Sequence, residues 1–181
     1  RVLLANGVGD GTGITKREAA ATASDLVNLA FMGNTVITTF NELKYFTQVT
    51  TIPYSSTHSS ASQEGFKNCT ALQEVTLPPS CVDLRGGDKS AYGGVGAFFG
   101  CTSLKKVNGS SQVKNIGGCS FYNCVALTTI DLQGVESIGG YAFHGCEALA
   151  IDLTGLLSKV TNLYLGTFYN TKVTGTLSMP L

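Results

Sequence analysis

A repeated pattern of apolar residues constrains the fold of this chain more than any other feature. Three segments carry the pattern Phe-x-x-Cys-x-x-Leu-x-x-Val/Ile, and they begin at Phe66, Phe98 and Phe121. A fourth copy begins at Phe143 and places its last apolar residue, Ile151, one position early. Such self-similarity predicts a solenoid, because one unit cannot bury its apolar face without stacking on its neighbours.

The spacing of the copies gives the length of one turn. The starting phenylalanines at 66, 98, 121, 143 and 168 are separated by 32, 23, 22 and 25 residues, and the copy at 168 is the weakest. A unit of 22 to 23 residues lies within the leucine-rich-repeat range of about 20 to 29 residues. We therefore predict an α/β repeat solenoid, a leucine-rich-repeat-like right-handed coil with one short parallel strand per repeat.

Alternating apolar and polar residues locate the expected strands. They predict strands at about 73–77, 105–107, 128–132 and 150–153, all in one parallel sheet. The segments 113–117 and 135–139 end in Ile-Gly and are expected to be return segments, since glycine permits a turn that other residues resist. The repeated phenylalanines are expected to form one buried column.

The first thirty residues differ from the repeats. Thr15-Lys-Arg-Glu18 matches a capping box and is followed by three alanines, which predicts a short helix starting near Lys16. We expect residues 1–30 to form an N-terminal cap region and residues 31–181 to form a single continuous solenoid. A cap is expected because an open solenoid end exposes apolar surface and strand edges.

Composition excludes two classes of function. Lysine plus arginine and aspartate plus glutamate number 12 each, and only 13% of residues are charged. A nucleic-acid-binding protein or a polybasic membrane-surface protein needs a basic surplus, which this chain lacks. Its apolar runs are shorter than the roughly 18 to 20 residues of a membrane helix, so we expect no membrane insertion of this segment.

Two copies carry a more specific resemblance. Gly96-Ala-Phe-Phe-Gly-Cys-Thr-Ser-Leu104 and Tyr141-Ala-Phe-His-Gly-Cys-Glu-Ala-Leu149 resemble the repeats of BspA-like leucine-rich-repeat proteins, and the resemblance extends over roughly residues 31 to 180. It implies a surface or secreted bacterial protein that adheres to a host or microbial surface protein or glycan. The family has no shared catalytic residues, and no cofactor is implied.

The cysteines are interpreted as structural. Four of them occupy one position of the repeat, where a small buried thiol with a raised pKa is expected: Cys69, Cys101, Cys124 and Cys146. Cys81 and Cys119 are off this register, and whether they form a bridge is left open. His144-x-Cys146 is the single closely spaced His-Cys pair, and zinc sites need more ligands, so no metal site is predicted. No Gly-x-Ser-x-Gly nucleophile elbow occurs, and no catalytic residue is predicted.

Two groups of residues are candidates for ligand binding. Outward-facing strand positions form a polar, nearly uncharged ladder suited to hydrogen bonding with a protein or glycan, and its candidates are Glu74, Lys106, Asn108 and Asp131. An insertion of about nine residues within 84–95 predicts a protruding loop of the kind that often serves binding, and its candidates are Arg85, Asp88, Lys89 and Tyr92. A structural spacer without a ligand and a hydrolase remain as alternative functions.

Overall fold

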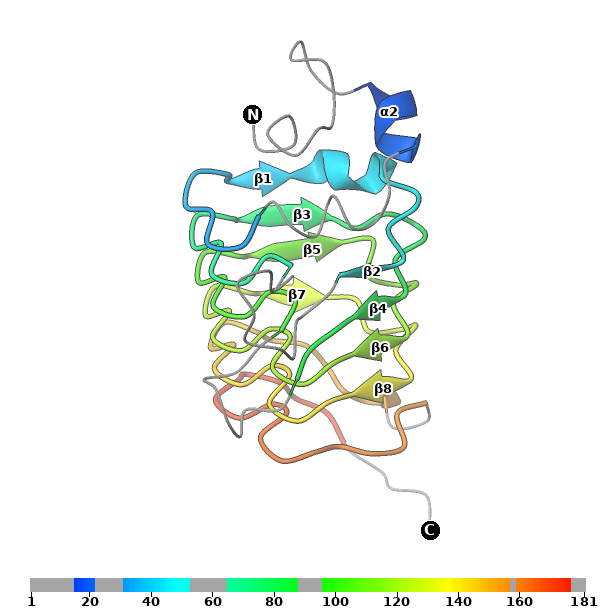
Figure 1. Ribbon diagram of the computed structural model, residues 1–181. Helices are drawn as coiled ribbons and strands as arrows, with labels where there is room; N and C mark the ends of the chain where they lie inside the picture. Colours follow the sequence, from blue (N-terminus) through cyan, green and yellow to red (C-terminus); the bar gives the residue numbers. More distant parts are fainter. Residues whose placement is uncertain (1–14, 22–30, 53–64, 88–95, 157–158, 177–181) are drawn as a thin grey trace.

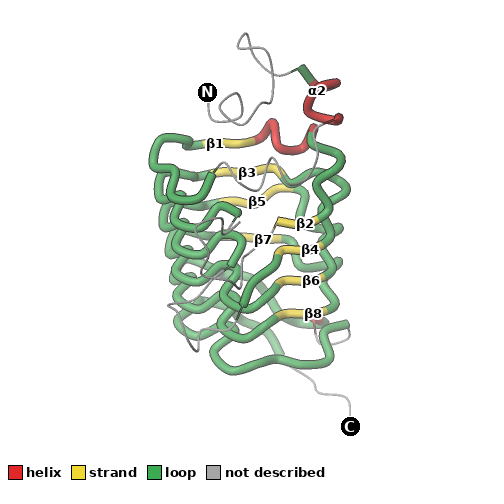
Figure 2. The backbone as a smooth tube through the Cα atoms, viewed as in Figure 1, coloured by secondary structure: helices red, strands yellow, loops and turns green. Residues whose placement is uncertain are grey.

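The computed structural model describes residues 15–21, 31–52, 65–87, 96–156 and 159–176. The chain winds into stacked turns, with short parallel strands aligned from turn to turn along the stack (Figure 1). Loops and tight turns make up most of each turn (Figure 2). The predicted repeat solenoid with a short parallel strand in each unit is thereby confirmed.

The strands form two separate parallel sheets of four strands each. Sheet A contains, in spatial order, β1 (Thr39–Phe40), β3 (Glu74–Thr76), β5 (Lys106–Asn108) and β7 (Thr129–Ile130). Sheet B contains, in spatial order, β2 (Thr51–Ile52), β4 (Asp83–Leu84), β6 (Asn115–Ile116) and β8 (Ser137–Ile138).

The prediction of one sheet was therefore wrong. The segments interpreted as return segments contain β6 and β8, in which Ile116 pairs in register with Leu84 and with Ile138. All three side chains are buried, so the same inward-facing periodicity that makes strands in sheet A also makes them in sheet B. The predicted strand at 150–153 is wrong as well, because that segment contributes only an isolated bridge between Asp152 and Thr174.

A column of stacked phenylalanine rings runs through the core as predicted, except that its last member, Phe168, is only partly buried. Successive ring centroids from Phe66 through Phe98, Phe121 and Phe143 to Phe168 lie 5.2 to 5.4 Å apart. The rings are within 8° of parallel, which is the offset stacking that aromatic pairs favour. Each added turn therefore extends the same apolar column, and stability accumulates from turn to turn.

The residue before each cysteine position has a left-handed backbone. Its φ angle lies between 56° and 73° in five turns, and only glycine and asparagine adopt this region routinely. The residues at this position are Asn68, Gly100, Asn123, Gly145 and Asn170. The left-handed residue reverses the backbone direction, so the phenylalanine and the cysteine on either side of it both point inward.

The predicted N-terminal helix is present as α2 (Lys16–Ala21). Its capping box is formed, because the backbone N–H of Glu18 donates to Thr15 Oγ1 at 3.2 Å and the N–H of Thr15 donates to Glu18 Oε2 at 2.8 Å. The helix contacts the 3-10 helix η1 (Asn41–Tyr45), where Lys16 Nζ lies 4.7 Å from the centre of the Tyr45 ring. Within the described ranges, no helix is long and apolar enough to span a membrane.

Candidate functional site

The predicted ladder on sheet A is a row of hydrogen-bonded side chains. Glu74 lies beside Lys106, and Thr76 lies beside Asn108, in the register of β3 and β5. Asn108 Nδ2 donates to Glu74 Oε1 at 2.6 Å and to Thr76 Oγ1 at 3.3 Å. These bonds hold the row in one geometry, so a ligand meets polar groups that are already ordered.

Asp131 extends this row on the neighbouring turn. Its backbone N–H donates to Ser110 Oγ at 3.1 Å, and its Oδ1 accepts from the backbone N–H of Gln133 at 2.9 Å. The residue is exposed. Three of the four ladder candidates therefore lie in β3 and β5 of sheet A, and Asp131 directly follows β7 on the next turn.

The loop candidates are not part of this row. Arg85 follows β4 on sheet B, where its Nε donates to Asp83 Oδ2 at 3.1 Å. Asp88, Lys89 and Tyr92 lie outside the described residues. The ladder and Arg85 therefore belong to different sheets and do not form one site.

Sheet A ends at β7 because the next turn is one residue short. Leu127-Thr-Thr-Ile-Asp-Leu132 corresponds to Leu149-Ala-Ile-Asp-Leu153, from which one residue is missing. Ala150 N still donates to Thr128 O at 3.3 Å. Beyond this bond, the described backbone has no hydrogen bond between 129–132 and 151–153. The segment 151–153 pairs instead with Thr174, through Leu153 N to Thr174 O at 2.8 Å and Thr174 N to Ile151 O at 3.0 Å.

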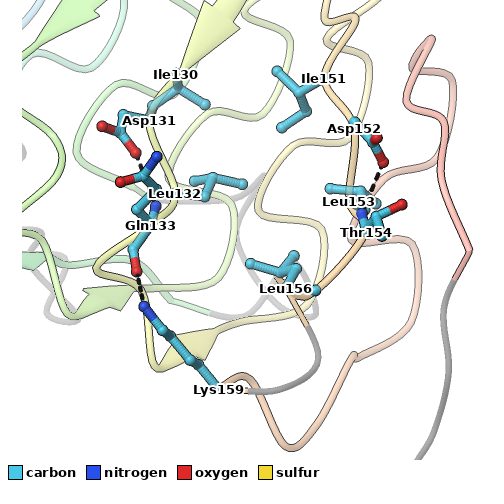
Figure 3. Close-up of a pocket in the computed structure, with 11 residues that line it drawn as sticks. Ile130, Asp131, Leu132, Gln133, Ile151, Asp152, Leu153, Thr154, Leu156 and Lys159 are labelled. Carbon is cyan, nitrogen blue, oxygen red and sulfur yellow. Dashed lines mark hydrogen bonds between the residues drawn. The ribbon is translucent and has the colours of Figure 1, made fainter.

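The broken ladder leaves a pocket of about 280 Å³ between the two segments, here called the split-ladder pocket (Figure 3). Ile151, Leu132 and Leu156 project into the space between the segments, while Asp131 and Asp152 lie on opposite margins of it (Figure 3). An apolar interior with charged groups at the margin is the usual composition of a ligand site.

The margin of the pocket carries fixed charges. Hydrogen bonds from the Thr154 hydroxyl and from the Thr154 backbone N–H lower the pKa of the exposed Asp152 carboxyl and hold its oxygens in place. On the opposite side, Lys159 Nζ donates to the backbone oxygen of Gln133 (Figure 3). The sequence analysis did not find this pocket, although the early position of Ile151 was its signal.

The four cysteines of the repeat form a row of thiols inside the core. Each Sγ donates to the backbone oxygen of the phenylalanine in the preceding turn, at 2.8 to 3.1 Å. All six cysteines are buried, as was predicted for the four in register. Their place inside the core leaves them inaccessible to a ligand. Among the described residues, no group of three or more His, Cys, Asp or Glu side chains could hold a metal ion.

The thiol pKa values differ along the row. Burial raises the pKa of Cys101 and of Cys124 well above the ordinary value, and it raises the pKa of Cys81 and of Cys146 to about 12. Cys69 departs from the predicted direction, because a hydrogen bond with the Cys101 thiol stabilises its thiolate and lowers its pKa.

Comparison with known proteins gives one match. No curated protein and no solved structure matches this chain. The family model for the BspA type leucine rich repeat region matches six copies over residues 18–87 and 89–180. These ranges include every strand of both sheets. The chain therefore belongs to the BspA-type leucine-rich-repeat family.

Proposed function

We propose that this chain is a non-catalytic binding module, secreted or displayed at a bacterial cell surface, whose ligand is a host or microbial surface protein. BspA-type repeat proteins are typically surface proteins, which supports this location. The observation that carries the proposal is the split-ladder pocket, which interrupts an otherwise continuous stack beside the polar row of sheet A.

The split-ladder pocket is suited to accept one apolar side chain of a protein ligand. Binding energy at protein interfaces concentrates where an apolar or aromatic side chain fills a desolvated pocket inside a polar rim. Ile130, Leu132 and Ile151 supply the apolar wall, and Asp131 and Asp152 supply the polar rim. A ligand that inserts an apolar side chain here gains burial without displacing any side chain of the core.

Strand β7 adds a second means of attachment. It is the last strand of sheet A within the described residues, and its outer edge faces the pocket. An extended segment of a ligand can pair with such an edge through its main chain, while its side chains occupy adjoining pockets. The polar row around Asn108 then contributes hydrogen bonds rather than long-range charge attraction.

The test is an array of purified extracellular-matrix and bacterial surface proteins probed with the whole chain. Thr154→Trp places a large ring at the exposed rim of the pocket, and we expect it to weaken capture by at least about tenfold. Thr102→Trp is the matched control, because Thr102 is an exposed threonine of a turn away from the pocket, and it should bind normally.

Two results would contradict this function. Capture that is equally strong for Thr154→Trp and for the unchanged chain would exclude the split-ladder pocket as the binding site. The absence of any captured protein would instead favour a structural spacer.

A further inference from the structure

A second recess lies on the outer side of sheet B. Its first wall consists of Asp83, Asn115 and Ser137, which are register partners in β4, β6 and β8. Asn115 and Ser137 are exposed. Three polar side chains of neighbouring turns are thus presented in one line, and adjacent strands lie about 4.8 Å apart.

Glycines make up most of the floor of this recess. Each residue of the polar wall is followed, two positions later in the sequence, by a residue that lines the floor. On the three successive turns these residues are Arg85, Gly117 and Gly139. A Cβ on Gly117 would lie 2.2 Å from the nitrogen of Gly86, and one on Gly139 would lie 2.4 Å from the nitrogen of Gly118. Close stacking of the turns therefore requires these glycines, and they line the recess with backbone alone.

Two adjoining cavities of about 320 and 580 Å³ occupy this space, and they share Gly86, Gly140 and Tyr164 as lining residues. Together they form one recess, here called the sheet B groove. It is larger than the split-ladder pocket, and the two have no lining residue in common.

An exposed tyrosine borders the groove. The segment from Leu156 to Phe168 is four residues longer than the corresponding segment from Val135 to Phe143. This longer segment carries Tyr164, whose exposed fraction is 57% and which lines both cavities. A Cβ on Gly140 would lie 3.4 Å from the Tyr164 Cβ, so the tyrosine stands directly beside the glycine floor.

The ion pair between Arg85 and Asp83 supplies hydrogen-bond donors and acceptors to the groove. Asp83 offers carboxylate oxygens as acceptors. The guanidinium group of Arg85 has five N–H donors, and it uses the one on Nε for its hydrogen bond to Asp83. The two charges cancel, and Asn115 and Ser137 add neutral donors and acceptors. The lining therefore offers hydrogen bonds in both directions and no net charge.

We propose that the sheet B groove binds a neutral oligosaccharide. A sugar ring presents an apolar C–H face, which stacks on an aromatic ring, and hydroxyl groups, which both donate and accept hydrogen bonds. Tyr164 is the stacking surface in this site, and Asp83, Arg85, Asn115 and Ser137 are the hydrogen-bonding partners. The three turns that line the groove span roughly 10 Å, the length of a short oligosaccharide.

The residues that line the groove favour a neutral oligosaccharide over two other classes of ligand. A sulfated or phosphorylated polymer requires a surplus of basic side chains, and Asp83 offsets the one arginine of the groove. An apolar peptide anchor requires aliphatic side chains in the lining, of which the split-ladder pocket has five, whereas six of the residues that line the groove are glycines and four carry polar side chains beside the tyrosine ring.

The test uses maltotriose, cellotriose and chitotriose as probes, titrated into the whole chain and followed by saturation-transfer NMR and calorimetry. We expect at least one trisaccharide to bind with a dissociation constant on the order of 1 mM. Tyr164→Ala should weaken that binding at least about tenfold, and Tyr164→Phe should change it less than about twofold because the ring is kept. Asn115→Ala should weaken it about threefold.

Tyr169→Ala is the matched control. Tyr169 is also an exposed tyrosine, with an exposed fraction of 66%, but it stacks on His144 and lines neither cavity of the groove. Its replacement should leave trisaccharide binding unchanged. Thermal unfolding of each variant confirms that the fold is retained.

Three results would overturn the proposal: no binding of any trisaccharide up to saturating concentration, an equal loss in Tyr164→Ala and Tyr169→Ala, or undiminished binding by Tyr164→Ala. Competition by a sulfated hexasaccharide at lower concentration than the neutral probes would overturn the assignment to neutral ligands. Because Thr154→Trp leaves the groove unaltered, this site and the proposed protein-binding function succeed or fail separately.

Discussion

The regular turns between Phe66 and Ile138 and the last turn from Phe143 onward use the same repeat with different results. In the regular turns, strands pair in register in both sheets, and every inward position is filled. In the last turn, one residue is missing before Ile151 and four are added after Leu156. The split-ladder pocket and the sheet B groove both border this turn. Regular turns therefore stabilise the fold, and both proposed binding sites border the turn in which the repeat length changes.

The largest expected difference between the two regions lies in the phenylalanine column. Phe121 is fully buried between Phe98 and Phe143, whereas Phe168 is partly buried and stacks on Phe143 alone in the described column. Phe121→Ala should lower the free energy of unfolding by roughly 3 to 5 kcal/mol. Phe168→Ala should cost about half as much. Chemical denaturation measures both, and equal costs would show that the last turn is as tightly packed as the regular ones.

Restoring the missing residue should convert the last turn into a regular one. A threonine inserted between Ala150 and Ile151 recreates the spacing of Leu127-Thr-Thr-Ile130 and lets the segment pair with β7. Two new backbone hydrogen bonds should raise the free energy of unfolding by about 1 to 2 kcal/mol.

The same insertion should abolish capture of the protein ligand, because it closes the split-ladder pocket. A threonine inserted between Gly93 and Gly94, within the loop expected from sequence, serves as the control. Hydrogen exchange of the β7 amides reports whether pairing has formed. Unchanged exchange with unchanged capture would show that chain length does not cause the split.

The third expected difference concerns the thiols, because the last turn has Thr171 at the position where the regular turns have a cysteine. Burial raises the pKa of Cys146 to about 12, above its value of about 9 in an unfolded chain. The stabilisation from the buried neutral thiol is complete below pH 9 and is lost as pH rises toward 12. Each such thiol contributes a fall on the order of 1 kcal/mol per pH unit in that window.

Cys146→Thr reproduces the residue of the last turn at a regular position, and threonine does not titrate there. The thermal midpoint of this variant should fall less between pH 8.5 and 10.5 than that of the unchanged chain. An identical pH dependence in the two proteins would show that Cys146 ionises as easily in the folded state as in the unfolded state.

The sequence predicted the stack well because the stack depends on periodicity. The phenylalanine column, the buried cysteines and the ladder from Glu74 to Asn108 all follow from residues at repeated positions, whereas the capping box at Thr15 follows from a local motif. Sheet B was missed because β6 and β8 are each followed directly by a glycine, Gly117 and Gly139, and a glycine there also indicates a turn.

The sites were harder to predict than the stack because they arise where the period changes. Ile151 lies one position earlier in its repeat than the corresponding Ile130. The sequence does not indicate whether this missing residue shortens the turn or prevents the segment from pairing with the strand before it. The place of Tyr164 beside Gly140 depends on the path of an enlarged turn, which no repeated position encodes. Arg85 was assigned to the insertion, whereas the structure places it directly after β4 with a regular backbone hydrogen bond to Ile52, and its pairing with Asp83 became evident only from the structure.

The row of thiols has a consequence for the environments in which this solenoid can persist. Each Cys Sγ joins its own turn to the carbonyl of the turn before it, at the place where many secreted domains carry a disulfide. These links form without an oxidant and survive a reductant. The stack can therefore assemble and keep these links in reducing surroundings, since none of the four hydrogen bonds depends on redox potential.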